Sequence, residues 1–225
     1  MLADAFAALG ITKDYAGMDF AGLEFDAQGW GDEHPIFERL MREVRPRTVI
    51  EVGTWKGASL LRMVAAAKIL RLDTQFVSID TWLGSYVDLW IDYRDDLMLR
   101  HGYPTMFRQF VFNMIEADAI DRVWPLPMTT TAAAAALTRL KVQADLIYVD
   151  AAHDEDEVAV DLKRFWPLLR PGGVMFGDDY DPAWPGVVAA VGAFARAQGL
   201  ALRVEPIRIG GRLSQTVPTV ETVEA

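Results

Sequence analysis

The sequence contains no cysteine and only three histidines among its 225 residues. Without cysteine the chain forms no disulfide bond and no thiolate metal site, which fits a reducing compartment, and we expect a cytoplasmic location. Acidic residues outnumber basic residues by 32 to 22, so the formal net charge is −10. Because nucleic acids and anionic membranes are bound through clustered Lys and Arg, we expect neither as a partner.

Other missing features narrow the class of protein further. The N-terminus has no basic segment followed by a long apolar core, and no apolar run is long enough to span a bilayer, so we predict no secretory signal and no membrane helix. There is no internal repeat and no linker rich in Pro, Gly or Ser. At 52% hydrophobic residues the chain can form one substantial core. We expect an N-terminal leader or lid over residues 1–29 and one domain over residues 30–225.

Short apolar runs alternate with helical patterns along the domain. The expected strands are 48–52, 76–80, 123–128, 144–150 and 173–177, with 200–206 and 209–215 as a closing antiparallel pair. The expected helices are 59–70, 107–117, an alanine-rich helix capped by Thr129, 155–169 and 187–198. This alternation predicts an α/β fold with a mostly parallel, seven-stranded sheet, helices on both faces and a C-terminal antiparallel hairpin.

The first expected strand is followed by Glu51-Val52-Gly53-Thr54-Trp55-Lys56-Gly57, and ligands bind at this end of parallel strands. Gly53 permits a tight turn, and the N–H groups at the start of the following helix favour an anionic group. The stretch is neither G-x-G-x-x-G nor a P-loop, so a nicotinamide site is the weaker interpretation. Asp80 ends the next strand, where an acidic residue can accept hydrogen bonds from ribose hydroxyls. The alternative is a turn glycine and a helix-capping aspartate with structural roles only.

Carboxylates follow the fourth and fifth strands. Asp150 ends one and Asp178 and Asp179 end the other, so three carboxylates can converge at one edge of the sheet. Two like charges about 4 Å apart repel by roughly 4 kcal/mol at an effective dielectric near 20. Mg²⁺ or another divalent cation, which prefers oxygen ligands, would offset this repulsion. Both neighbouring aspartates can be ligands only if the backbone turns directly after Gly177; otherwise they face water in a turn.

His153 lies three residues after Asp150, at the start of an expected helix. It is the best-placed general base, and the helix N-terminus should favour its neutral form. Asp150 is the second candidate for this catalytic role. The alternative for His153 is to cap the helix or to orient Asp150. The acids at 154–157 complement the helix dipole.

Four stretches together, EVGTWKG, SIDTWLGS, IYVDAAH and LRPGGVMFGDDY, resemble class I methyltransferases that use S-adenosylmethionine. The resemblance covers roughly residues 30–212. Within this class, the sequence is similar to metal-dependent O-methyltransferases of the macrocin/mycinamicin sugar type, which act in natural-product biosynthesis. It resembles the catechol type more distantly. The catechol type carries lysine at the offset where this chain has His153.

The resemblance implies a Rossmann-like fold and site roles. The first-turn glycines would hold the methionine part of the cofactor, the acid after the second strand its ribose, and threonines after the third strand would lie near adenine. The cofactor residues expected on this basis are Glu51, Gly53, Thr54, Trp55, Gly57, Asp80, Thr81, Trp82, Thr129, Thr130 and Asp150. The resemblance also implies Asp150, Asp178 and Asp179 as metal ligands.

The segment 82–103 is long, aromatic and interrupted by two glycines, and long connections are uncommon unless functional. The candidates to contact the acceptor are Trp82, Tyr86, Trp90, Tyr93 and, directly after the fifth strand, Tyr180. Alternatively, these aromatic side chains pack into the core or into an oligomer interface.

We therefore expect a Mg²⁺-assisted, S-adenosylmethionine-dependent O-methyltransferase of small hydroxylated molecules. A glycosylated or sugar-nucleotide acceptor is favoured over a phenol or catechol. Two rival functions stay open: a cofactor-binding scaffold without catalysis, and another metal-dependent enzyme of hydroxylase-like or hydrolytic type. The aromatic content and the apolar leader favour a homo-oligomer, a dimer or larger.

Overall fold

Seven strands form one sheet in the order β3-β2-β1-β4-β5-β7-β6. A computed structural model describes residues 2–29, 33–84, 87–209 and 212–221. The strands are β1 Thr48–Val52, β2 Gln75–Asp80, β3 Val123–Pro127, β4 Ala144–Val149, β5 Leu169–Gly177, β6 Leu202–Ile209 and β7 Arg212–Glu221. Strands β1 to β5 pair in parallel, and β7 runs antiparallel between β5 and β6. This confirms the predicted α/β fold and its C-terminal antiparallel hairpin.

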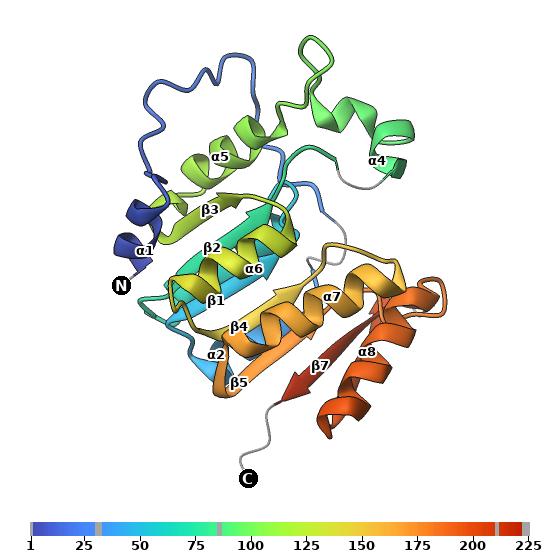
Figure 1. Cartoon of the computed structure of the whole chain (residues 1–225). Helices are drawn as coiled ribbons and strands as arrows, with labels where there is room; N and C mark the ends of the chain where they lie inside the picture. The colour runs from blue at the N-terminus through green and yellow to red at the C-terminus, as the bar shows by residue number, and fades with distance from the viewer. Residues whose placement is uncertain (1, 30–32, 85–86, 210–211, 222–225) are drawn as a thin grey trace.

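Helices cover both faces of the sheet. They are α1 Leu2–Ala8, α2 Ile36–Val44, α3 Ala58–Ile69, α4 Val87–Ile91, α5 Met106–Glu116, α6 Thr130–Arg139, α7 Glu155–Phe165 and α8 Pro185–Gln198. Short 3₁₀ segments are η1 Arg94–Leu97, η2 Ile120–Arg122 and η3 Trp166–Leu168. In Figure 1, α6 and α7 lie in front of the sheet and α2 lies behind it. Within the described residues no helix is long and apolar enough to cross a bilayer.

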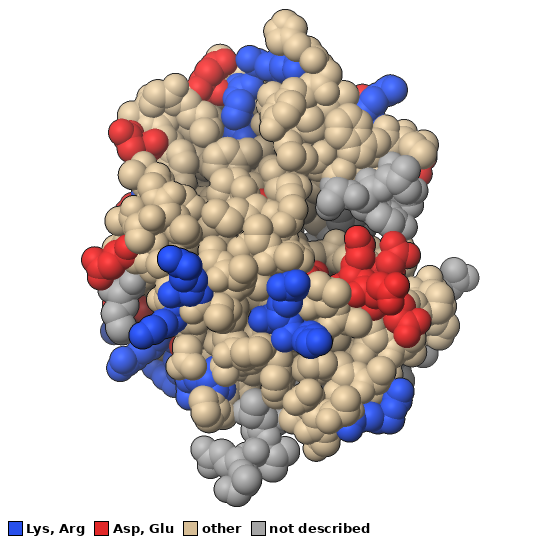
Figure 2. All heavy atoms as spheres, viewed as in Figure 1, with Lys and Arg blue, Asp and Glu red and all other residues tan. Residues whose placement is uncertain are grey.

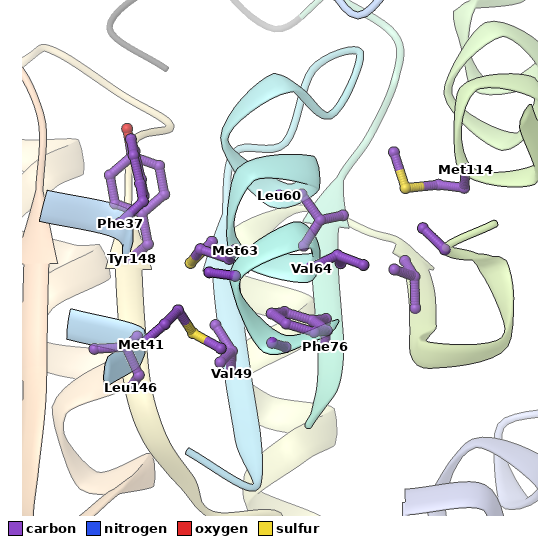
Figure 3. Close-up of a cluster of buried hydrophobic side chains, with 14 of the residues drawn as sticks. Phe37, Met41, Val49, Leu60, Met63, Val64, Phe76, Met114, Leu146 and Tyr148 are labelled. Carbon is purple, nitrogen blue, oxygen red and sulfur yellow. The ribbon is translucent and has the colours of Figure 1, made fainter. Parts of the chain in front are cut away.

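Two buried clusters lie on the two faces of the sheet. Side chains of α2, α3 and α5 form one cluster, part of which is drawn in Figure 3, and side chains of α1, α6, α7 and α8 form the other. The neighbouring residues Val49 and Ile50 of β1 belong to opposite clusters, because successive strand side chains point to opposite faces. A strand that is buried on both faces reads as a continuous apolar run, which is why the sequence pattern predicted it.

Three predicted parts have clearly wrong boundaries. The closing strands predicted over 200–206 and 209–215 are β6 Leu202–Ile209 and β7 Arg212–Glu221. The helix predicted over 155–169 ends at Phe165, because Pro167 has no backbone N–H to continue it and the chain tightens into η3. Strand β5 begins at Leu169 rather than at 173, with a shift of register against β4. The predicted cap of α6 is confirmed, since Thr129 Oγ1 accepts the backbone N–H of Ala132 at 3.3 Å.

The leader packs on the domain. Phe6 of α1 is fully buried, with its ring centroid 5.0 Å from that of Trp124. Further along, the Asp26 carboxylate lies 2.5 Å from Lys56 Nζ, and Asp96 of η1 lies at the same distance from the same ammonium. Because the Lys56 side chain is only 3% exposed, this lysine joins the leader, the turn after β1 and the segment after β2.

Candidate active site

A cavity of about 900 Å³ opens at the carboxyl ends of the parallel strands. Residues from the loops after β1, β2, β3, β4 and β5 line it, together with residues of the leader and of the segment after β2. The predicted cofactor residues that line it are Gly53, Thr54, Trp55, Asp80, Thr81, Thr129, Thr130 and Asp150. The rule that ligands bind at the carboxyl ends of parallel strands therefore correctly predicted that residues of four separate loops meet in one cavity.

The turn after β1 approaches the loop after β4 so closely that only glycine fits at its centre. Gly53 has φ +84°, and a Cβ on it would lie 2.0 Å from the backbone oxygen of Asp150. The Asp80 carboxylate accepts the backbone N–H groups of Thr54 at 3.1 Å and Trp55 at 2.9 Å through one oxygen. Its other oxygen accepts the N–H of Trp82 at 2.8 Å. Burial raises the pKa of Asp80, and these hydrogen bonds partly oppose the rise.

Glu51 and Gly57 lie beneath the cavity, so their predicted direct contact with the cofactor needs correction. Glu51 is fully buried and accepts the hydroxyls of Thr54, at 3.3 Å, and of Ser59. Burial raises the pKa of Glu51 to about 8, although both hydroxyls oppose the rise. A Cβ on Gly57 would lie 2.5 Å from Met114 Cε, so this glycine allows α5 to pack against the turn. Both residues support the site from below.

The predicted aromatic contacts are mostly corrected as well. Trp82 is 1% exposed, donates its indole N–H to the Trp55 carbonyl at 2.8 Å and packs against two phenylalanines of α5. It braces the turn after β1 and does not line the cavity. Trp90 donates its indole N–H to the carbonyl of Gly84 and does not line the cavity. Tyr180 does not line it either, whereas Tyr93 does. Tyr86 lies outside the described residues.

A carboxylate–histidine cluster stands at the ends of β4 and β5. Asp150, His153 and Asp179 each offer one ligand atom, and these atoms lie within 4.8 Å of one another. His153 Nε2 lies 2.8 Å from Asp179 Oδ2. Asp179 has φ +59°, so the chain does turn directly after β5. The structure nevertheless replaces Asp178 by His153 in the predicted trio, because Asp178 Oδ1 turns back to accept the N–H of Asp179 at 2.8 Å.

The cluster is electrostatically unfavourable without a positive partner. Burial and the neighbouring carboxylates raise the pKa of Asp150 well above its usual value and that of Asp178 to about 7. Burial lowers the pKa of His153, but the hydrogen bond to Asp179 and the surrounding acids raise it more, so its pKa lies above 6.5. The prediction that the helix start keeps His153 neutral was therefore wrong for the cluster without a cation.

The cavity wall as a whole is acidic. Its carboxylates number eight, namely Asp80, Asp92, Asp150, Asp156, Glu157, Asp161, Asp178 and Asp179. No Lys or Arg belongs to the wall among the residues that the structure describes. Figure 2 shows acidic side chains gathered over the beginning of α7, which supplies three acids in its first turn. Such a wall attracts cationic ligands and repels anionic ones.

Sequence reasoning missed several residues of the wall. Ser59 lies two residues after Gly57 at the helix start, a position from which it could have been predicted. Gln28 accepts the indole N–H of Trp55 at 3.0 Å, and the Trp184 ring stacks on His153 with centroids 4.2 Å apart. Nothing local in the sequence marks these last two, because they reach the cavity from the leader and from the start of α8.

Comparison with known proteins decides the family. A family model described as a methyltransferase domain matches residues 50–180, which is more than half of the chain. The chain belongs to this methyltransferase family. The matched range runs from β1 to the turn after β5 and so contains both the turn at Gly53 and the carboxylate–histidine cluster. No curated protein with a similar sequence was found.

Solved structures with the same fold cover nearly the whole methyltransferase chain. An O-methyltransferase from Bacillus cereus in complex with SAH has a TM-score of 0.61 at 16% identity, covering 98% of this chain and 90% of that one. TomG from Streptomyces achromogenes, an O-methyltransferase involved in tomaymycin synthesis, was solved with SAM; its TM-score is 0.60 at 17% identity, covering 99% and 96%. A putative caffeoyl-CoA O-methyltransferase from Staphylococcus aureus has a TM-score of 0.59 at 12% identity, covering 98% and 97%. The predicted class I methyltransferase fold is confirmed.

Proposed function

We propose that this methyltransferase transfers the methyl group of S-adenosylmethionine to a hydroxyl of a small molecule, with a divalent cation held at the cluster of Asp150, His153 and Asp179. The observation that carries the proposal is that one cavity contains both the Gly53–Asp80 turn and this cluster. The similar structures support it, because their titles name O-methyltransferases with SAH or SAM bound.

Different residues of the cavity would bind the cofactor and the acceptor. The turn at Gly53 and the Asp80 carboxylate would hold the cofactor, and the cluster would hold the acceptor. A bond forms between the acceptor oxygen and the methyl carbon, the bond from that carbon to sulfur breaks, and sulfur keeps the electron pair. The hydroxyl proton passes to His153 or to Asp150.

The donor set fits a divalent cation. Two carboxylates and one imidazole offer ligand atoms within 4.8 Å of one another, and the carboxylate of Asp178 adjoins them. Asp150 and Asp178 have raised pKa values, and no basic side chain belongs to the described part of the wall. The cation would supply positive charge that stabilises a deprotonated acceptor hydroxyl. Oxygen ligands suit Mg²⁺ or Mn²⁺, and a direct bond from His153 would favour a softer metal. Offsetting the carboxylate charge would also reduce the rise in the His153 pKa and so favour the neutral imidazole that a base requires.

The charge of the cavity wall narrows the range of acceptors that we propose. Sugar nucleotides and other phosphorylated acceptors would meet a wall with eight acidic side chains and, among the described residues, no Lys or Arg to pair with a phosphate. Raised pKa values leave some of these acids partly protonated, and the cofactor sulfonium and one divalent cation offset part of the charge of the others. We therefore favour a neutral or amine-bearing glycoside, with a phenol or catechol second. A cytoplasmic location and a homo-oligomeric state stay predictions.

Calorimetric titration with S-adenosylhomocysteine, with and without Mg²⁺, tests the cofactor. We expect one-to-one binding that Asp80→Ala weakens by at least tenfold. No binding in either condition would rule out the proposal together with the cofactor-binding scaffold, and would leave the other metal-dependent activity as the remaining alternative.

A second titration, with Mn²⁺ alone, tests the metal. We expect Asp179→Asn to weaken binding, whereas Asp181→Asn, two residues further on and outside the cavity wall, should not. His153→Asn separates the two roles of the histidine: weaker Mn²⁺ binding identifies a ligand, and unchanged binding with a lower kcat identifies the base.

Three catechols of different charge test the acceptor: dopamine (+1), catechol (0) and 3,4-dihydroxybenzoate (−1). We expect kcat/KM to fall in that order, and the spread to shrink at high salt. The reverse order would refute the electrostatic argument. If no catechol reacts, the same series is run with an amino sugar, a neutral sugar and a sugar phosphate.

A further inference from the structure

We propose that the Tyr148 hydroxyl is a positioning group for Asp150, fixing the orientation in which this carboxylate meets its ligands. The inference rests on the proposed function in that Asp150 belongs to the reacting cluster. The two residues are two positions apart at the end of β4, so their side chains project from the same face. The phenol donates its O–H to Asp150 Oδ2 at 3.0 Å.

The ring that carries this hydroxyl is held on two sides. Phe37 of α2 meets it edge-on at 5.2 Å between centroids, and Phe176 of β5 lies at 4.8 Å. Figure 3 shows the Tyr148 ring beside Phe37, with its oxygen pointing away from the other labelled core side chains. Since Tyr148 is only 1% exposed, the hydroxyl is ordered by folding and not by ligand binding.

The core does not need the hydroxyl. A phenylalanine at position 148 would fill the same space between the same aromatic neighbours, and burying a hydroxyl without a partner is unfavourable. The oxygen is accommodated here because Asp150 Oδ2 accepts the hydrogen bond that it donates. The function of the hydroxyl therefore lies in what it does to Asp150.

The hydrogen bond completes the fixation of Asp150. The backbone N–H of Asp150 already donates to the Val52 carbonyl at 2.8 Å, and its own carbonyl is packed against Gly53. With Oδ2 bound to Tyr148, the carboxylate cannot rotate freely, and its orientation toward the cavity is set before a ligand arrives. Partners of this kind, one step removed from a metal, typically change metal affinity by 10–100-fold.

Tyr148→Phe removes the oxygen and keeps the ring. The first readout is the affinity of the SAH-saturated protein for Mn²⁺ alone, for which we expect a loss of at least tenfold. Affinity for SAH should stay within twofold, because Tyr148 does not line the cavity. Tyr15→Phe, which removes a partly buried hydroxyl on the leader, is the matched control and should change neither value.

An unchanged Mn²⁺ affinity in Tyr148→Phe would overturn the inference. If the wild-type protein binds SAH but no Mn²⁺, the metal part of the proposed function fails by itself, and the comparison moves to steady-state kinetics. A tenfold lower kcat at unchanged KM for the cofactor then supports positioning by Tyr148, and an unchanged kcat refutes it.

Discussion

Replacing Glu51 by glutamine removes a buried titratable group next to the turn after β1, and with it a measurable part of the pH dependence of stability. Glu51 is fully buried, and its pKa rises from 4.5 to about 8 because burial penalises the carboxylate. A shift of that size corresponds to roughly 5 kcal/mol between the two protonation states. The folded protein keeps the proton that the unfolded chain releases above pH 4.5. Stability is therefore greatest at low pH and is lost as pH rises toward 8, beyond which the loss is complete.

The window from about pH 6 to about pH 8.5 contains roughly 2–3 kcal/mol of this loss. Urea unfolding of wild type and Glu51→Gln at both pH values measures it. Other buried acids contribute in the same direction, but they are common to both proteins, so the difference between the two slopes isolates Glu51. We expect the variant to lose less stability across the window by that amount, because a neutral amide replaces the carboxylate.

Glu38→Gln, on the exposed side of α2, is the control, since exposed substitutions usually stay within about 0.5 kcal/mol. An equal loss of stability from about pH 6 to about pH 8.5 in wild type and Glu51→Gln would refute the reasoning. It would mean that the pKa of Glu51 is the same in the folded and the unfolded chain.

Three further substitutions test the parts that surround the cavity. Lys56→Met should cost about 1–2 kcal/mol in urea unfolding, because two charge-assisted hydrogen bonds are lost while the partly exposed carboxylates that remain are solvated by water; an unchanged stability would mean that the leader is not held through this residue. Gly53→Ala should abolish SAH binding in calorimetry, because its Cβ clashes with the loop after β4, whereas Gly102→Ala, at a similar φ of +78° in open space, should leave binding intact. Trp82→Phe should cost about 1 kcal/mol and weaken SAH binding severalfold, because the turn after β1 loses the indole N–H that it accepts; binding equal to wild type would show that this brace is dispensable.

The order of strands and helices and the edge of the sheet where ligands meet were predictable from the sequence. Strands buried on both faces are continuous apolar runs, and parallel pairing forces their carboxyl ends to one side. Gly53, Asp80, Asp150 and Asp179 each follow such a run, so their meeting in one cavity needs only that rule. The cap at Thr129 was also predictable, because capping depends on residues three apart.

The depth of each side chain at that edge was decided by the tertiary structure. Glu51 and Trp82 belong to the same motifs as the residues of the wall, yet they point into the core, since a motif does not record what packs behind it. Asp178 stays out of the cluster because its Oδ1 accepts the N–H of Asp179, and His153 joins it because its Nε2 lies 2.8 Å from Asp179 Oδ2; the sequence records neither contact. Gln28 and Trp184 reach the site from segments that the sequence leaves unconnected to it, and only the packing of the leader and of α8 brings them there. Local pattern therefore determined the elements and their order, whereas long-range packing decided which side chains face the ligand.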